Sequence, residues 1–324
     1  MKWNTRIVHW FLGIAAAGFL SLQVLAWHHA RALLRYSEEG GESASIESLS
    51  ILDKARIFVA GASRPRPDNF WNPEKFGLAA ETVRFRSSDG VELEAWFVDA
   101  PGAGQPVLFF HGFGTSRSSV LDEAAAVQAM GHPVLLVDLR GSGGSDGRRT
   151  TMGWHEALDV QAAVAWIKEK LPDREGPFLY GQSMGAAAAL RAVSALGVEV
   201  DGIVVEAVFD SMLNAVRNRF RAMGWPAFPA AESLVFWGGI QNGFNGFRHN
   251  PADYAAGVRI PVLVLHGEQD PRVTTPQARR VYDRLAGPRH FVAFPAAWHS
   301  SCLASDPDKW REALGRFLAE AGGP

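Results

Sequence analysis

The sequence predicts an α/β protein whose core is a mostly parallel, doubly wound β-sheet. Short apolar runs recur from residue 107 onward, and segments of helical pattern separate them. Strands that are buried on both faces of a parallel sheet read as nearly continuous apolar runs. Alternation of strand and helix favours right-handed crossovers within one sheet. The runs are residues 107–110, 134–137, 178–180, 203–205, 262–265 and 291–294; the helical segments are 120–130, 155–171, 186–196, 277–285 and 308–320.

Size and charge are those of an ordinary folded protein. The chain has 324 residues, 47% of them hydrophobic, and a net charge of −2. One large domain with appendages is therefore expected, and the balanced charge argues against a nucleic-acid-binding surface. Cys302 is the single cysteine, which excludes an internal disulfide and a cysteine-based zinc site. We expect it to be a small buried side chain, and we expect no metal or organic cofactor.

Residues 7–27 form an apolar stretch without a formal charge. As a helix, this stretch would be roughly 31 Å long, which is close to the hydrocarbon thickness of a bilayer. We therefore expect residues 1–35 to be a membrane anchor. Two alternatives stay open: a signal peptide cleaved near Val24-Leu25-Ala26, and a buried or interfacial helix. Positive charges flank both ends of the stretch, so the pattern does not assign the side of the membrane.

The remaining segments divide into a linker, a large folded domain and an insertion. Residues 36–80 are expected to be a linker with a short helix at 51–60, and residues 81–324 the large domain, which opens with a β-hairpin at 81–86 and 91–98. Residues 209–257 are too many for a connection and too aromatic for a solvated loop. We expect a helical lid over the C-terminal edge of the sheet, where open α/β sheets bind ligands. Its predicted substrate contacts are Phe220, Trp225, Phe228, Phe236 and Trp237.

Gly181-Gln182-Ser183-Met184-Gly185 lies between an apolar strand run and an Ala-rich helical run. Strand, sharp turn and helix are the context of a nucleophile elbow. A serine hydroxyl becomes a useful nucleophile only when it is exposed beside a base and oxyanion donors. The two glycines leave room for the turn, because a Cβ there would collide with the neighbouring strand and helix. Ser183 is therefore the predicted nucleophile.

Three further motifs follow strand runs. His111-Gly112-Phe113-Gly114 follows 107–110, Leu265-His266-Gly267-Glu268-Gln269-Asp270-Pro271 ends 262–265, and Phe294-Pro295-Ala296-Ala297-Trp298-His299 closes the last strand. With the elbow, these motifs make residues 81–321 resemble the α/β-hydrolase fold. The nearest likeness is to serine hydrolases grouped with monoacylglycerol lipases, lysophospholipase-like and BEM46-like proteins. The resemblance implies that the main-chain N–H groups of Phe113 and Met184 form an oxyanion hole.

The acid and the base should follow the nucleophile in the order Ser, Asp or Glu, His. Asp270 is the predicted acid, with Glu206 or Asp210 after the preceding strand as rivals. His299 is the predicted base, which accepts the Ser183 proton while the acid holds its tautomer. His266 comes too early in the chain to serve as the base. The other histidines, His132, His155, His249 and His290, are expected at turns or on the surface.

These expectations combine into a membrane-anchored serine hydrolase of carboxylic esters that works through an acyl-Ser183 intermediate. The aromatic lid favours an apolar acyl chain, as in lipid-like esters. Dehalogenase and epoxide hydrolase relatives need Asp at the elbow, so Ser183 excludes them. A peptidase or amidase of the proline aminopeptidase type stays open, although the lid offers it only Glu232 and Asp253 to hold a free amine. A non-catalytic membrane scaffold of the same fold is the alternative from another class.

Overall fold

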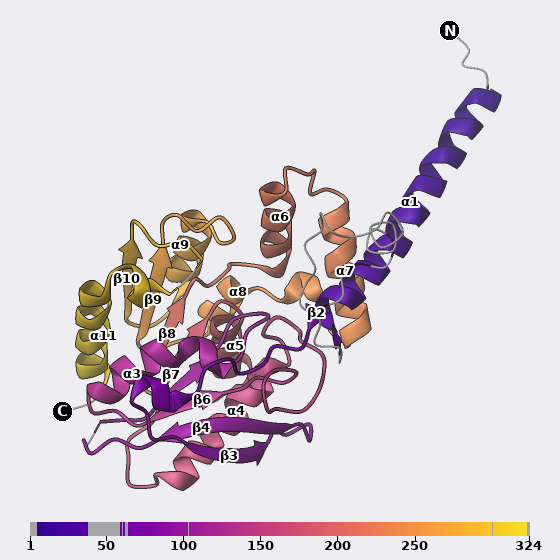
Figure 1. The fold of residues 1–324 in the computed structure, drawn as a ribbon. Helices are drawn as coiled ribbons and strands as arrows, with labels where there is room; N and C mark the ends of the chain where they lie inside the picture. Colours follow the sequence, from indigo (N-terminus) through magenta and orange to yellow (C-terminus); the bar gives the residue numbers. More distant parts are fainter. Residues whose placement is uncertain are drawn as a thin grey trace.

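The computed structural model describes residues 5–37, 59, 61, 64–102, 104–299 and 301–322. The expected helix at 51–60 and most of the expected linker therefore lie outside the described residues. Helix α1 (Thr5–Leu34) extends away from a layered domain that contains the rest of the described chain (Figure 1). Two short strands, β1 (Tyr36–Ser37) and β2 (Arg64–Pro65), pair in parallel at the base of this helix.

One eight-stranded sheet forms the centre of the domain, in the order β10-β9-β8-β7-β5-β6-β4-β3. The hairpin strands β3 (Glu81–Arg86) and β4 (Glu92–Val98) are antiparallel, and β4 pairs antiparallel with β6. The remaining pairs are parallel. Their strands are β5 (Val107–Phe110), β6 (Val134–Val137), β7 (Phe178–Gln182), β8 (Gly202–Glu206), β9 (Val262–Gly267) and β10 (Arg289–Phe294). The predicted mostly parallel α/β sheet is confirmed.

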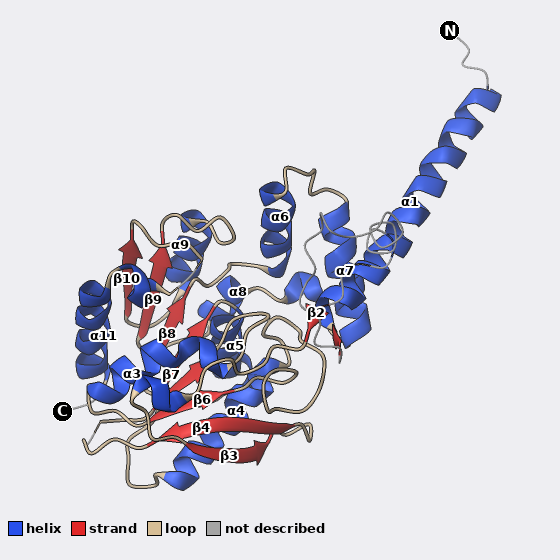
Figure 2. Ribbon diagram, in the orientation of Figure 1, coloured by secondary structure: helices blue, strands red, loops and turns tan. Residues whose placement is uncertain are grey.

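Helices cover both faces of the sheet (Figure 2). One face packs against α4 (Glu156–Lys170), α5 (Met184–Leu196) and α9 (Thr275–Arg284). The other packs against α3 (Leu121–Ala129), which the 3-10 turn η3 (Arg117–Val120) precedes, and against α10 (Cys302–Ser305) and α11 (Pro307–Ala321). A further 3-10 turn, η2 (Pro73–Phe76), lies before the hairpin.

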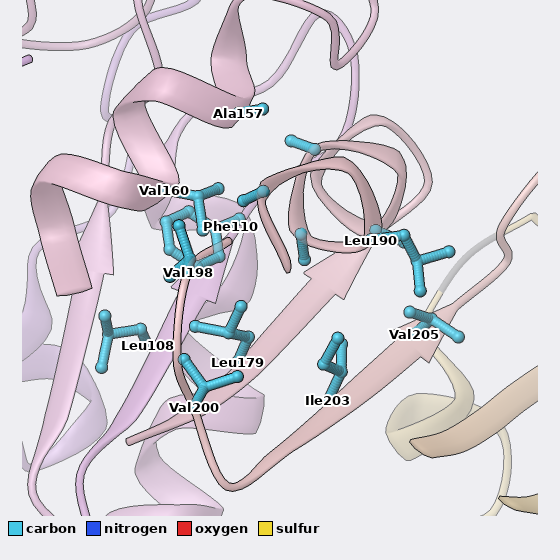
Figure 3. Packing of buried hydrophobic residues seen from close by; sticks show 14 of the residues in the cluster. Leu108, Phe110, Ala157, Val160, Leu179, Leu190, Val198, Val200, Ile203 and Val205 are labelled. Atoms are coloured by element: carbon cyan, nitrogen blue, oxygen red, sulfur yellow. The ribbon is translucent and has the colours of Figure 1, made fainter. Parts of the chain in front are cut away.

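Burial on both faces explains the continuous apolar runs. Leu108 and Leu179 lie in the core on the α4–α5 side, as Figure 3 shows, whereas Phe109 and Tyr180 lie in the core on the α3–α11 side. Since successive side chains of a strand point to opposite faces, a strand covered on both sides needs apolar residues at every position.

The insertion after β8 is helical, as predicted. It contains α6 (Met212–Ala222), α7 (Ala230–Asn242), the 3-10 turn η4 (Gly246–Arg248) and α8 (Pro251–Ala255). We keep the name lid for α6, α7 and the loop between them. Helix α7 lies along the C-terminal half of α1, while α8 returns to pack against α5 and α9. Arg217 of α6 and Glu232 of α7 form a 2.5 Å ion pair that joins the two lid helices.

Helix α1 is long and apolar enough to cross a membrane, and the most apolar part of it is not buried against the protein. Residues 6–21 are exposed throughout, and contact with the fold begins at Leu22. The helix is therefore a candidate membrane span by length, composition and exposure.

Candidate active site

The predicted elbow is a strand–turn–helix junction with a strained backbone at its apex. Strand β7 ends at Gln182, α5 begins at Met184, and Ser183 between them has φ +49° and ψ −101°. Positive φ is costly for a residue with a side chain, and such strain recurs at active sites. A Cβ on Gly181 would lie 2.5 Å from the Ala186 nitrogen, and one on Gly185 would lie 2.1 Å from the Phe110 oxygen. Both glycines are therefore required by close packing.

The turn after β5 lies directly beside the elbow. A Cβ on Gly112 would be 3.9 Å from the Cβ of Ser183. Buried His111 holds this turn: the Leu139 N–H donates to His111 Nε2 over 3.1 Å, so the ring proton is on Nδ1 and is donated to the Gly112 oxygen over 2.8 Å. Burial lowers the pKa of His111, which keeps the ring neutral in this role.

The His111 contact orients the Gly112–Phe113 peptide group, whose N–H is a predicted oxyanion donor. The C=O of Gly112 and the N–H of Phe113 belong to one planar peptide and point in opposite directions. Thr115 Oγ1 also donates to the Gly112 oxygen, over 2.9 Å. Because two donors hold that oxygen, the Phe113 N–H is held pointing in the opposite direction.

Met184 is the first residue of α5, so its N–H is among those that a helix leaves without an intrahelical partner.

Asp270 and His299 are brought together from two neighbouring strands. His299 Nδ1 donates to Asp270 Oδ2 over 2.6 Å, and the Asp270 side chain is fully buried. The other carboxylate oxygen, Oδ1, accepts the N–H groups of Arg272 at 2.8 Å and Val273 at 2.9 Å. This arrangement fixes the carboxylate and places the His299 proton on Nδ1. Its Nε2 is then the basic nitrogen.

Ser183, Asp270 and His299 follow the parallel strands β7, β9 and β10, so all three lie at the same edge of the sheet. In the part of the chain that the structure describes, no hydrogen bond joins Ser183 Oγ to His299. Catalytic hydrogen bonds often become short only when substrate is bound. The elbow and the His299 segment are nevertheless connected, because Glu206 accepts the Ser183 N–H at its main-chain oxygen (2.8 Å) and the Cys302 N–H at Oε1 (2.6 Å).

The rival acids are occupied elsewhere. Glu206 is buried and its carboxylate accepts hydrogen bonds from the Tyr180 hydroxyl and the Cys302 N–H. Asp210 is also buried, and it pairs with Arg280 and accepts from Asn214 Nδ2 over 2.9 Å. Of the three acids considered, Asp270 is the one that faces His299.

Comparison with known proteins identifies the fold. Residues 105–230 match the family model described as alpha/beta hydrolase fold. The esterase Pf2001 of Pyrococcus furiosus superposes with a TM-score of 0.68 at 25% identity, over 80% of this chain and 97% of that one. The chain has the α/β-hydrolase fold.

Two proteins are similar to this chain in sequence. The protein bem46 of Schizosaccharomyces pombe is 23% identical over 300 residues, which are 89% of this chain and 94% of the relative. Lysophosphatidylserine lipase ABHD12 of Rattus norvegicus is 24% identical over 220 residues, which are 66% of this chain and 53% of the relative. The hydrolase therefore resembles the BEM46-like proteins, and these similarities together support hydrolase activity.

The sequence did not single out a buried carboxyl pair directly behind the elbow. Gln182, the residue before Ser183, donates from Nε2 to Glu123 Oε1 over 3.1 Å and to Glu206 Oε2 over 3.5 Å. Burial first, and the charge of Glu206 second, raise the pKa of Glu123 to about 7. Glu123 belongs to α3 and carries no motif, so nothing in its local sequence signals the pairing.

The predicted lid aromatics occupy different environments in the hydrolase. Trp225 and Phe228 lie in or beside the α6–α7 loop and are 59% and 74% exposed, and Phe236 is also exposed. Phe220 is half-buried on α6. Trp237 contacts α1: its ring lies 5.1 Å from that of Trp27, edge to face. A direct contact of these side chains with substrate stays a prediction.

The predicted environments of Cys302 and of the remaining histidines can be compared with the structure. Cys302 is buried as expected, and burial raises the pKa of its thiol. His249 was expected at a turn or on the surface: it directly follows the turn η4, but it is fully buried between Tyr254 and the main-chain oxygen of Met152. Within the described ranges, His266 is buried without a hydrogen-bond partner, and no group of three or more His, Cys, Asp or Glu side chains is arranged to hold a metal ion.

Proposed function

We propose that this α/β-hydrolase cleaves carboxylic esters through a covalent acyl-Ser183 intermediate, with His299 as general base and Asp270 as its partner. The observation that carries the proposal is the 2.6 Å contact between His299 and buried Asp270 at the strand edge that also carries the Ser183 elbow. Nucleophile, base and a third group that orients the base form the arrangement by which a weak hydroxyl is activated.

Each residue has a defined role in the proposed reaction. Ser183 Oγ attacks the ester carbonyl while His299 Nε2 takes its proton. Asp270, which accepts the Nδ1 proton, stabilises the resulting imidazolium. The N–H groups of Phe113 and Met184 stabilise the oxyanion, and His111 keeps the Phe113 amide in orientation through Gly112. His299 then protonates the leaving alcohol, and water activated by the same imidazole releases the acid.

An ester is favoured over an amide or peptide substrate. A proline aminopeptidase-type enzyme must hold the free amine of its substrate with available carboxylates. Three carboxylates lie within residues 209–257, and each is paired with an arginine: Glu232 with Arg217 at 2.5 Å, Asp253 with Arg284 at 3.1 Å, and Asp210 with Arg280. Two relatives point the same way, since one is a solved esterase and another is named a lysophosphatidylserine lipase.

We infer further that α1 is a membrane anchor and that the lid works at the membrane surface. Trp237 Nε1 donates to Gln23 Oε1 and Gln241 Nε2 donates to the Trp27 oxygen, over 3.0 and 2.8 Å. Gln23 Nε2 also donates to Ser233 Oγ over 3.0 Å. These contacts fasten lid helix α7 to the anchor.

The length of the free part of α1 places the bilayer close to the lid. The exposed stretch, residues 6–21, is roughly 24 Å long as a helix, whereas a hydrocarbon core is about 30 Å thick. A bilayer of ordinary thickness would therefore reach the level of Gln23, where α7 is attached. Exposed Trp225 and Phe228 next to this level suit a lid that takes apolar acyl chains from the membrane.

The test is labelling of the full-length protein, in non-ionic micelles, with a fluorophosphonate probe. We expect Ser183 to be labelled, and Ser183→Ala and His299→Ala to abolish labelling and the hydrolysis of nitrophenyl esters. Asp210→Asn, which alters a rival acid, should retain turnover that Asp270→Asn loses. Labelling that survives in Ser183→Ala would refute the proposal. A well-folded wild-type protein without labelling would favour the non-catalytic scaffold.

A further inference from the structure

Two arginine side chains lie against the residue that we assign to the oxyanion hole. The guanidinium carbons of Arg64 and Arg219 are each 5.1 Å from the centroid of the Phe113 ring. Arg64 comes from β2, at the base of the anchor, and Arg219 comes from lid helix α6. A Cβ on neighbouring Gly114 would lie 3.6 Å from Arg64 Nη1. Two cations from distant parts of the chain therefore meet at the turn beside Ser183.

A third arginine connects this pair to the acid turn. Asn218, next to Arg219 on α6, donates from Nδ2 to the main-chain oxygen of Arg272 over 2.9 Å. The N–H of Arg272 in turn donates to Asp270. We call Arg64, Arg219 and Arg272 the arginine cluster. The cluster spans the distance from the oxyanion turn to the turn that carries the catalytic acid.

No carboxylate in the described part of the chain compensates the charge of the cluster. Among the residues that the structure describes, none of its three members forms an ion pair with Asp or Glu, whereas neighbouring Arg217 and Arg280 both do. Partial burial of Arg219, and after that the charges of Arg64 and Arg272, lower the pKa of its guanidinium to about 10. It is still cationic at neutral pH, so like charges are held together at an energetic cost.

We propose that the arginine cluster binds an anionic group, a phosphate or a carboxylate, that the ester substrate carries near its scissile bond. Repelling cations that lie unpaired at a reaction centre are stabilised when an anion joins them. Guanidinium groups also present a planar set of donors that matches both phosphate and carboxylate oxygens. The proposal rests on the ester hydrolase function proposed above, and it narrows the substrate class to acidic esters with an apolar acyl chain.

A purely structural role explains the cluster less well. Stacking of one arginine on Phe113 would support the oxyanion turn, but a second cation at the same ring adds repulsion that an apolar side chain would avoid. Arg219 also forms no hydrogen bond to any part of the chain that the structure describes, so its donors are available to a ligand.

The decisive experiment compares two esters that differ only in charge. Full-length enzyme in non-ionic micelles is assayed for octanoate release from 1-octanoylglycerol and from 1-octanoylglycerol 3-phosphate. We expect wild type to prefer the phosphate ester in kcat/KM. Arg219→Gln and Arg64→Gln should each lower this preference by about 10- to 100-fold, which is the range of a lost charge-assisted hydrogen bond. Arg219→Lys should retain part of the preference.

The controls separate local binding from general charge effects. Arg311→Gln removes an equal charge from an exposed position on α11 and should leave the preference unchanged. Inorganic phosphate at matched ionic strength should compete with the phosphate ester if the cluster accepts a free ion, and should not compete if it recognises the anion only as part of a substrate. An equal loss on both esters in Arg219→Gln would overturn the proposal, since it would indicate support of the oxyanion turn instead.

A binding assay keeps this proposal separate from the proposed function. Ser183→Ala protein is titrated with both octanoyl compounds by calorimetry. Tighter binding of the phosphate compound that is lost in Ser183→Ala/Arg219→Gln supports the cluster even when no ester is hydrolysed. Equal binding of the two compounds would refute the cluster even when the fluorophosphonate experiment succeeds.

Discussion

Replacing Glu123 with glutamine should make the hydrolase more stable in alkaline solution and stabilise it much less in mild acid. Glu123 and Glu206 are both buried, and Gln182 donates to both of them. Glu206 also accepts from the Tyr180 hydroxyl and the Cys302 N–H. With more donors around it, Glu206 is better suited to carry the negative charge, so Glu123 takes the proton of the pair.

The size of the effect follows from the pKa of Glu123, which rises from its ordinary value of 4.5 to about 7 in the fold. A carboxyl with a raised folded-state pKa binds its proton more tightly in the folded protein. Its contribution to stability is therefore fully present below pH 4.5 and is lost as the pH rises through about 7. Each pKa unit corresponds to about 1.4 kcal/mol, so the loss at pH 8 is on the order of 3 kcal/mol.

Thermal unfolding of wild type, Glu123→Gln and Asp122→Asn at pH 5 and pH 8 measures this effect. Glutamine keeps an acceptor for Gln182 but cannot ionise, so its unfolding midpoint should exceed that of wild type at pH 8, and by much less at pH 5. Asp122 is the exposed neighbour on α3, and its variant should follow wild type at both pH values. A Glu123→Gln variant that is no more stable than wild type at pH 8 would refute the linkage.

Three further predictions concern the site and the anchor, and the second of them has a matched control in α11. Asp270→Asn should lower kcat for ester hydrolysis by about 10³- to 10⁴-fold with little change in unfolding temperature, because the wrong His299 tautomer is then favoured. Gly185→Ala should destabilise the fold by at least about 2 kcal/mol in thermal unfolding, since its Cβ would meet a carbonyl oxygen at 2.1 Å. Gly315→Ala, in an open helical position, should instead gain about 0.5–1 kcal/mol. A double-mutant cycle of Trp27→Ala and Trp237→Ala should give a coupling of about 0.5–1.5 kcal/mol, and additive losses would contradict the α1–α7 contact.

Local pattern was sufficient for the sheet and for the order of the motifs. The six apolar runs coincide with β5 to β10, and differences are confined to one or two residues at their ends. The reason is that each of these strands is buried on both faces. Such a strand needs apolar residues at nearly every position, so its own sequence is enough to predict it. The elbow was predictable for a similar reason: the need for its two glycines comes from steric limits of the sharp turn at Ser183.

Features that depend on contacts between distant segments could not be predicted from the sequence. His249 was expected at a turn or on the surface; it does follow the turn η4, but its side chain is buried against Met152 and Tyr254. Residues 36–37 were expected to belong to a linker; in the structure they form β1, which is paired with β2. Neither segment has a periodic pattern that predicts its structure. The contacts that decide it are made with residues far away in the chain.

By itself, the sequence determined the strand order along the chain, the elbow at Ser183 and the candidates for acid and base, since each is a property of a short segment. Tertiary structure alone decided that Asp270, and not Glu206 or Asp210, faces His299. It also decided that the lid is fastened to α1, that Glu123 lies behind the elbow, and that Arg64 and Arg219 meet at Phe113. These are pairings between residues tens to hundreds of positions apart, and only the packed sheet brings them within contact distance.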